Sequence, residues 1–176
     1  IDRIVSLDDF DVEKAAYLRE TFRIPGMGQT TARYFRDKLA MRFKAQEAGL
    51  YGPAFSPLFN NGAINRYLEA VEPPWLIKPR SEASATGIRK VHNQREAWQV
   101  LDELGEERHH FLIEQFKPGD VFHVDSLTVG GEVRFCRSSQ YLSTPFEVMH
   151  GGGIFRSATV EYGSDDEQRL YTLNQD

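Results

Sequence analysis

The chain has 176 residues, 40% hydrophobic and 12% aromatic, which is enough for one domain or two small lobes with a real core. Its formal net charge of −5 argues against a nucleic-acid partner, which requires a basic face, and no apolar run is long enough to cross a membrane. A single cysteine, Cys136, excludes an internal disulfide and fits a reducing compartment, so we expect a cytoplasmic protein. No signal peptide opens the chain, and because it begins on Ile1 inside a strand-like run, we expect it to be a piece of a longer protein.

Helical periodicity dominates the first fifty residues. Residues 1–6 have the pattern of the end of a strand, and Asp11 is suited to cap a helix over 12–22. A second helix is predicted near 31–48, closed by Gly49. The apolar faces of these helices consist of Ala15, Leu18 and Phe22 in the first and of Ala32, Phe35, Leu39 and Phe43 in the second.

The most informative stretch runs from Trp75 to Val91. It predicts a buried strand that delivers Lys78 to a loop of small and hydroxyl-bearing residues at 81–87, followed by a second strand. Small side chains let backbone N–H groups approach phosphate oxygens, and a lysine adds positive charge, so the pattern suits a polyanion such as a nucleoside triphosphate. It lacks the GxxxxGK[ST] spacing of the strand–loop–helix phosphate loop, and an ordinary surface hairpin with a solvated lysine is the alternative.

The other predicted elements alternate between helices and strands. Prolines favour an extended segment over 52–57, and Asn60 or Asn61 is suited to cap a helix that reaches Glu69. Asn93 with Glu96 begins another helix, and a strand follows at 111–115. A hairpin is predicted over 121–141, then a strand over 154–160 and a helix started by Ser164 with Glu167. This order predicts an α+β fold.

The predicted hairpin turns at Gly130-Gly131, and its register follows from that turn. It places Val129 opposite Glu132, Leu127 opposite Arg134, Asp125 opposite Cys136, and His123 opposite Ser138. One face of the hairpin would then carry mainly polar residues, namely His123, Asp125, Glu132, Arg134 and Ser138. Such a face is either solvated or the wall of a site.

Several pieces of the sequence occur in an order typical of one family. They are Ile24-Pro25-Gly26, the run from Arg36 to Met41, Gly49 with Pro53, Ile77-Lys78-Pro79, the small loop ending at Gly87, the run from Leu112 to Phe116 with Gly119, and His123-Val124-Asp125. Together they resemble the ATP-grasp superfamily, and most of all its carbamoyl-phosphate-synthase-like and biotin-carboxylase-like members.

The resemblance implies two lobes of antiparallel sheet with helices, with ATP between the sheets. Residues 1–27 would be the tail of a preceding α/β domain and 28–50 connecting helices. Residues 51–117 would form the small lobe with its phosphate lid, and 118–176 part of the large lobe, whose C-terminal strands are missing.

The resemblance also implies roles for individual residues. Lys38 and Lys78 would contact the phosphates beneath the lid at 81–87, whose matching positions are Ser81, Ser84, Ala85, Thr86 and Gly87. Glu114, Gln115, Phe116 and Lys117 would form the adenine hinge, with Phe116 in the core and backbone groups of Gln115 and Lys117 on the base edge. The alternatives are a surface Lys38 paired with Glu residues on its own helix, a strand-end Lys78 reaching solvent, and Glu114 in water.

The sequence departs from the family pattern in two places. Many relatives carry an acid for the ribose hydroxyls where this chain has Val121, so we assign ribose recognition to Asp120 or His123. The family's magnesium ligands lie on strands after the final helix, so we expect the Mg²⁺ ligands beyond Asp176, and we identify no catalytic residue.

The implied function is the ATP-binding core of a ligase that activates a carboxylate as an acyl phosphate for attack by an amine. Its partners would be ATP and small-molecule carboxylates and amines, and we expect association into a homo-oligomer through an open sheet edge. We expect these 176 residues alone to lack ligase activity. The alternative is a non-catalytic nucleotide-binding module that uses the same fold.

Overall fold

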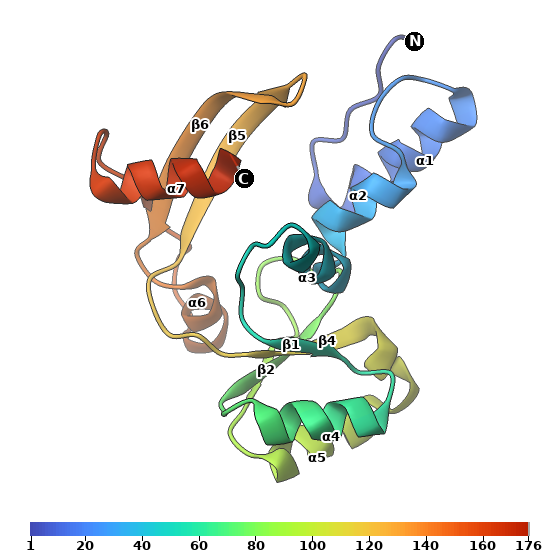
Figure 1. Cartoon of the computed structure of the whole chain (residues 1–176), viewed down its shortest axis with the longest axis vertical. Helices are drawn as coiled ribbons and strands as arrows, with labels where there is room; N and C mark the ends of the chain where they lie inside the picture. The colour runs from blue at the N-terminus through green and yellow to red at the C-terminus, as the bar shows by residue number, and fades with distance from the viewer. Residues whose placement is uncertain (176) are drawn as a thin grey trace. The chain divides into compact units, whose positions relative to one another are not determined.

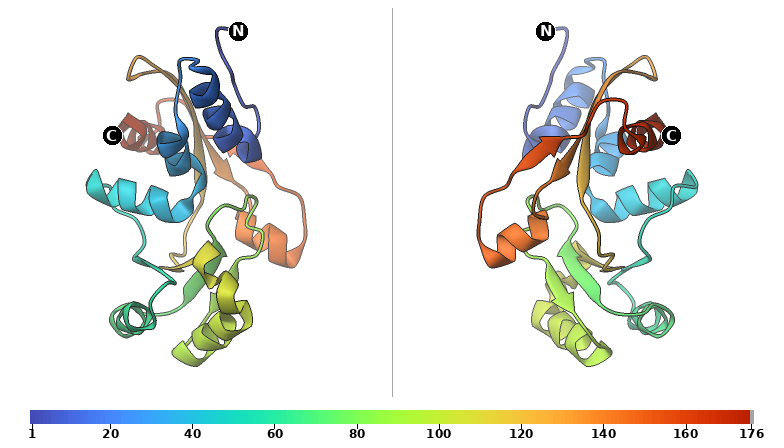
Figure 2. Two further views of the ribbon diagram at one scale, coloured as in Figure 1. Left: turned by 90° about the vertical axis from the view of Figure 1, so that its right-hand side faces the viewer. Right: turned by 90° about the vertical axis from the view of Figure 1, so that its left-hand side faces the viewer.

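The computed structural model describes residues 1–175, and the chain divides into two compact units, Ile1–Lys117 and Pro118 onward. The first unit opens with a short 3-10 helix, η1 (Asp9–Asp11), followed by α1 (Val12–Phe22), α2 (Gln29–Arg36) and α3 (Lys38–Glu47). Helices α1 and α2 lie side by side (Figure 2). The strand expected over residues 1–6 is wrong, since this segment belongs to neither of the two described sheets.

The predicted apolar faces of the N-terminal helices are partly wrong. In α1 Ala15 is buried, whereas Leu18 and Phe22 are exposed. Their place is taken by Arg19, which is buried and donates hydrogen bonds to the carbonyls of Ile4 (2.7 Å) and Met27 (2.9 Å).

The single helix expected over 31–48 is also wrong. It breaks at Asp37, whose extended backbone (φ −85°, ψ 105°) ends α2 and begins α3. The Asp37 side chain accepts from the N–H groups of Leu39 and Ala40, so capping competes with a continuous helix and prevails. As a result Phe35 and Phe43 are exposed, while Ala32 and Leu39 are buried.

The rest of the first unit is a four-stranded antiparallel sheet with helices. Its elements are β1 (Phe55–Pro57), α4 (Asn61–Ala70), β2 (Trp75–Pro79), β3 (Arg89–Val91), α5 (Gln94–Leu104), η2 (Gly105–His110) and β4 (Phe111–Gln115). The strand order is β1-β4-β2-β3. The predicted helix caps are confirmed, because the side chains of Asn60 and Asn93 accept from the N–H groups of Ala63 and Glu96.

The two faces of this sheet differ in chemistry. Helices α4 and α5 cover one face, and α3 lies over the other (Figure 1). The apolar core under α4 and α5 includes Leu58, Ile64, Tyr67, Leu68, Trp75, Ile77, Val91, Ala97, Leu101 and Ile113. Because side chains alternate along a strand, Lys78 and Glu114 are directed to the opposite face, toward α3.

The second unit is a three-stranded antiparallel sheet with two helices. It contains β5 (Phe122–Val129), β6 (Glu132–Tyr141), α6 (Pro145–Gly151), β7 (Ser157–Thr159) and α7 (Asp165–Gln175), in the strand order β5-β6-β7, with α7 against β6. The predicted α+β class with two antiparallel sheets is therefore confirmed. Helix α6 was not expected, although Thr144 and Glu147 form a capping box at its start.

The predicted hairpin turn is confirmed, but its register holds only beside the turn. A bulge between Leu127 and Thr128 shifts the pairing by one residue. Asp125 therefore faces Arg137 instead of Cys136, and His123 faces Ser139 instead of Ser138. The expected polar face is wrong for Ser138, which pairs with Val124 on the other side and is buried.

Candidate nucleotide-binding site

Lys38 and Lys78 line one hollow of the first unit, although forty residues separate them in the sequence. Lys38 is the first residue of α3, and Lys78 lies near the end of β2. The hollow has a volume of about 340 Å³, and the loop after β2 forms its other wall. Its lining consists of Asp9, Phe35, Arg36, Lys38, Met41, Lys78, Pro79, Glu82, Ala83, Ser84, Ala85, Thr86 and Ile88. The structure thus brings together both predicted phosphate lysines and much of the predicted lid.

Lys78 belongs to a buried ionic cluster on the sheet. Its ammonium donates to one carboxylate oxygen of Glu114, and the Arg42 Nε donates to the other at 3.1 Å. Lys78 is only 9% exposed and Glu114 5%. The alternatives of a strand-end lysine reaching solvent and a hydrated Glu114 are therefore wrong. One carboxylate shared by two cations leaves this cluster with a net positive charge.

Burial has a clear electrostatic consequence for both lysines. It lowers the pKa of Lys38 below its usual value, and the nearby charges of Lys78 and Arg36 lower it further. Burial also lowers the pKa of Lys78, although the Glu114 carboxylate acts in the opposite direction. A bound anion would stabilise the protonated form of both lysines and so counteract this lowering of their pKa values.

The loop over this hollow is held by cations at its first residues. Arg36 donates to the Ser81 carbonyl, and the Lys38 ammonium donates to the Glu82 carbonyl. The alternative of a Lys38 paired with Glu residues is wrong, because the partners of its ammonium are backbone carbonyls. Further along, Ser84 and Ala85 adopt positive φ values of 56° and 59°, which L-residues rarely hold without a local constraint.

Gly87 ends the predicted lid at a position that requires glycine. Its φ is +71°, and a Cβ there would lie 3.0 Å from Cγ of Pro79. The end of the loop is therefore packed closely against the end of β2, while its middle residues line the hollow.

The predicted hinge lies at the end of β4. The N–H of Gln115 donates to the Ala54 carbonyl at 2.8 Å, so this N–H is already engaged and the adenine contact would fall to the Gln115 carbonyl. The N–H of Phe116 donates to Pro74 at 2.9 Å. Phe116 was expected in the core, and this is wrong: it is partly exposed, with the Lys90 ammonium 3.6 Å from its ring centroid. Lys117 is exposed.

The predicted ribose residues, Asp120 and His123, belong to the second unit. Asp120 is exposed, and His123 is partly buried beside Tyr141, with ring centroids 5.0 Å apart. The His123 Nε2 lies 3.6 Å from the Asp125 carboxylate, and its buried Nδ1 has no hydrogen-bond partner among residues 1–175. An unsatisfied ring nitrogen is compatible with a ligand contact at this residue.

Sequence reasoning missed three charged residues next to the lysines: Arg42, Asp37 and Arg80. The signal for Asp37 was its position before an apolar helical run, where Asp is a preferred cap. Arg42 and Arg80 gave no comparable signal, because their partners are distant in the chain.

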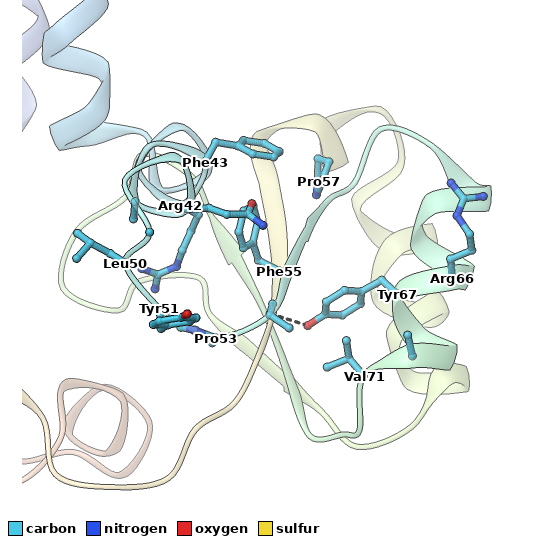
Figure 3. A pocket seen from close by; sticks show the side chains of 16 residues that line it. Arg42, Phe43, Leu50, Tyr51, Pro53, Phe55, Pro57, Arg66, Tyr67 and Val71 are labelled. Carbon is cyan, nitrogen blue, oxygen red and sulfur yellow. Dashed lines mark hydrogen bonds between the residues drawn. The ribbon is translucent and has the colours of Figure 1, made fainter.

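A second and larger hollow in the first unit lies between α3, the segment before β1, and α4 (Figure 3). Its volume is about 760 Å³, and its lining is mostly apolar, including Phe43, Tyr51, Phe55 and Tyr67. The Tyr67 hydroxyl donates to the Ala54 carbonyl at 3.0 Å, and burial raises the pKa of that hydroxyl. Neither predicted phosphate lysine lines it, so we do not assign the phosphates there.

Residues 1–175 contain no group of three or more His, Cys, Asp or Glu side chains arranged to hold a metal ion. The Mg²⁺ ligands expected beyond Asp176 therefore stay a prediction. Within the same range, none of the helices combines the length and apolar character needed to span a bilayer. Cytoplasmic location and homo-oligomerisation likewise stay predictions.

No protein-family model matches the chain. An L-arginine-specific L-amino acid ligase of Bacillus subtilis is 27% identical over 146 residues, which are 80% of this chain and 35% of that protein. A D-alanine–D-alanine ligase of Marinobacter nauticus is 31% identical over 91 residues, 52% of this chain and 28% of the relative. The chain therefore spans about a third of the length of these curated relatives.

A solved structure has a fold similar to that of this chain. The N5-carboxyaminoimidazole ribonucleotide synthetase of Thermus thermophilus superposes with a TM-score of 0.71 at 23% identity, over 97% of this chain and 44% of that one. The narrower likeness to carbamoyl-phosphate-synthase-like and biotin-carboxylase-like members stays a prediction. The sequence relatives and the shared fold agree: the chain is similar in sequence to ATP-grasp ligases and has the ATP-grasp fold.

Proposed function

We propose that this chain supplies the ATP-binding part of a ligase that activates a carboxylate as an acyl phosphate and joins it to an amine. The observation that carries this proposal is the hollow in which Lys38 and Lys78 meet beneath the loop of small residues. The buried Lys78, the partly buried Lys38, the net positive cluster around Glu114 and a loop of small side chains suit a polyphosphate.

Both curated relatives support an amino acid as the substrate class. Their names describe ligases of amino acids, which carry both the carboxylate and the amine that such a reaction joins. In the proposed reaction a carboxylate oxygen attacks the γ-phosphorus of ATP, the bond from that phosphorus to the β–γ bridging oxygen breaks, and ADP leaves. The amine nitrogen then attacks the acyl carbon and loses a proton, and the carbon–oxygen bond to phosphate breaks to release inorganic phosphate.

The role of this chain in that reaction is to bind and orient the nucleotide. Lys38 and Lys78 would neutralise phosphate oxygens, which lowers the cost of negative charge on the transferred group. The carbonyl of Gln115 and the N–H of Lys117 would contact the adenine edge, and Asp120 or His123 the ribose. Magnesium, when bound, would neutralise phosphate charge further, and no described residue is assigned to it.

Isothermal titration with ATP tests the nucleotide site. Lys78→Ala and Lys38→Ala should each weaken ATP binding about 10- to 100-fold, as expected for the loss of a charge-assisted contact. Lys44→Ala is the matched control, because Lys44 lies on α3 outside the hollow and pairs with Glu47 at the surface. Circular dichroism should verify that the variants fold. Unchanged ATP affinity in both lysine variants would remove the phosphate assignment.

A coupled assay for ADP, run on this chain and on any longer protein that contains it, distinguishes the ligase from a non-catalytic nucleotide-binding module. ADP release that depends on an added amino acid supports the ligase. ATP binding without any such release, across amino acids of different side-chain classes, favours the binding module.

A further inference from the structure

Asp37 and Arg80 form a bidentate ion pair beside Lys38 and Lys78, the predicted phosphate-binding lysines. The Arg80 Nε donates to Asp37 Oδ1 at 2.9 Å, and its Nη2 donates to Oδ2. The Asp37 carboxylate is buried, with its side chain only 9% exposed. Such bidentate pairs fix the orientation of both side chains as well as their distance.

Each partner of this pair is also anchored to its own element. Asp37 caps α3 through the N–H groups of Leu39 and Ala40, while the third Arg80 nitrogen, Nη1, donates to the His109 carbonyl at 3.0 Å. A backbone hydrogen bond makes the same connection one residue later: the N–H of Lys38 donates to the Arg80 carbonyl at 2.9 Å. The first turn of α3 is therefore tied to the end of β2 at a fixed position.

The sequence neighbours of the pair explain what this tie does. Asp37 immediately precedes Lys38, and Arg80 follows Lys78 by two residues. The ion pair between Asp37 and Arg80 therefore also fixes the distance between the two lysines. Without an anion, two ammonium groups in one hollow repel each other, and the loop carbonyls satisfy only Lys38. A rigid tie is the structural means of holding both cations in place before a ligand arrives.

We propose that Asp37 and Arg80 are positioning residues that hold Lys38 and Lys78 at one polyphosphate site. This inference rests on the proposed function, and it adds that the affinity for the β- and γ-phosphates depends on residues that need not touch them.

Isothermal titration with ATP and with AMP tests the proposal. Asp37→Asn keeps a capping oxygen for α3 but loses the charge of the pair, and Arg80→Gln removes the guanidinium. Both should weaken ATP binding about tenfold and leave AMP binding unchanged, because AMP lacks the phosphates that the lysine pair would hold. Arg80→Lys keeps the charge and should lie between the wild type and Arg80→Gln. The control is Arg89→Gln, which breaks the exposed pair with Glu103 and should change neither affinity.

A second measurement does not require ATP to bind. Lysine side-chain NMR of the full 176-residue chain would follow the pKa of Lys38 in the wild type and in Asp37→Asn. Loss of a neighbouring carboxylate by itself lowers a lysine pKa, whereas release of Lys38 from its partly buried position near Lys78 raises it. A raised pKa supports the positioning role.

The outcomes separate the two ideas. A wild-type chain that binds neither nucleotide removes the proposed function, and the NMR titration still decides the positioning role. An equal loss of ATP and AMP affinity, unchanged ATP affinity in both variants, or a Lys38 pKa that stays or falls in Asp37→Asn would overturn the positioning role.

Discussion

Lys78 donates to the carboxylate of Glu114 across the neighbouring strands β2 and β4, and both side chains are buried. In the strand register Glu114 faces Leu76, two residues before Lys78, so the pair is diagonal on one face of the sheet. Arg42 reaches the same carboxylate from α3. This single acid therefore offsets the burial of Lys78 and the partial burial of Arg42, and it leaves an ammonium with further N–H groups for an anion.

Removal of Glu114 should strongly destabilise the first unit. Glu114→Ala would leave Lys78 and Arg42 without their buried counter-ion, and breaking a buried pair in this way costs about 3–5 kcal/mol. Glu103→Ala is the matched control, because it breaks an exposed pair with Arg89, and such pairs contribute about 0–1 kcal/mol. The free energy of unfolding, measured with urea for both variants, should differ accordingly. Similar losses in the two variants would contradict the buried-pair assignment.

Local signals in the sequence predicted much of this fold. Asn60 and Asn93 were recognisable as caps because a cap acts on backbone N–H groups two or three residues away. The β5–β6 turn followed from Gly130-Gly131, but the bulge at Leu127 did not, because nothing in the local pattern marks an extra residue in one strand. The break at Asp37 was missed for a related reason: a cap residue inside a helical pattern is decided by its tertiary partner, here Arg80.

The candidate site was predicted unevenly. The pattern of a strand followed by a small-residue loop predicted Lys78, and a resemblance in motif order predicted Lys38; the structure places both in one hollow. Arg42 and Arg80 were missed because their partners, Glu114 and Asp37, lie 72 and 43 residues away in the chain. Ion pairs of this separation leave no periodic signal, so only the folded chain reveals them.

ATP affinity should begin to fall at a lower pH than it would if both lysines had the usual pKa. Burial lowers the pKa of Lys38 and of Lys78 below the usual 10.5, and only the protonated ammonium attracts phosphate. The affinity should therefore begin to fall below pH 10.5, as each lysine loses its proton in the free protein. Isothermal titration across this range measures the effect, and Lys38→Ala should show a shallower fall. An affinity that stays constant up to pH 10.5 would contradict the role of both lysines.

The acid stability of the chain should depend on Asp37. Burial by itself raises the pKa of this carboxyl, but the Arg80 hydrogen bonds and charge, with the N–H groups of Ala40 and Leu39, outweigh it and lower the pKa below 3.8. The unfolded chain then takes up the proton first, so this stabilisation is present above pH 3.8 and is lost as the pH falls through the lowered pKa.

Urea unfolding at a series of acidic pH values measures this dependence. Asp37→Asn should reduce stability at neutral pH and flatten the decrease below pH 3.8. Asp102→Asn, on the exposed side of α5, is the control and should leave the acid branch as in the wild type. An acid branch that is equally steep in Asp37→Asn and in the wild type would show that the Asp37–Arg80 pair is not maintained in solution.

In the loop at 81–87, the amide hydrogens at 81–82 and those at 83–85 and 87 should exchange at different rates. Its first carbonyls accept from Arg36 and Lys38, whereas the described loop amides gain one backbone bond of their own, from Thr86 to Ala83 at 3.1 Å. Amides at 83–85 and 87, which lack such a bond, should therefore exchange quickly in the free chain, and saturating ATP should slow them if they bind phosphate. Lys38→Ala should speed exchange at 81–82 without ATP, because the anchor at Glu82 is lost. The amides of α5 serve as the control and should not respond. Equal exchange at 83–87 with and without ATP would mean that the loop is a structural hairpin and not a phosphate lid.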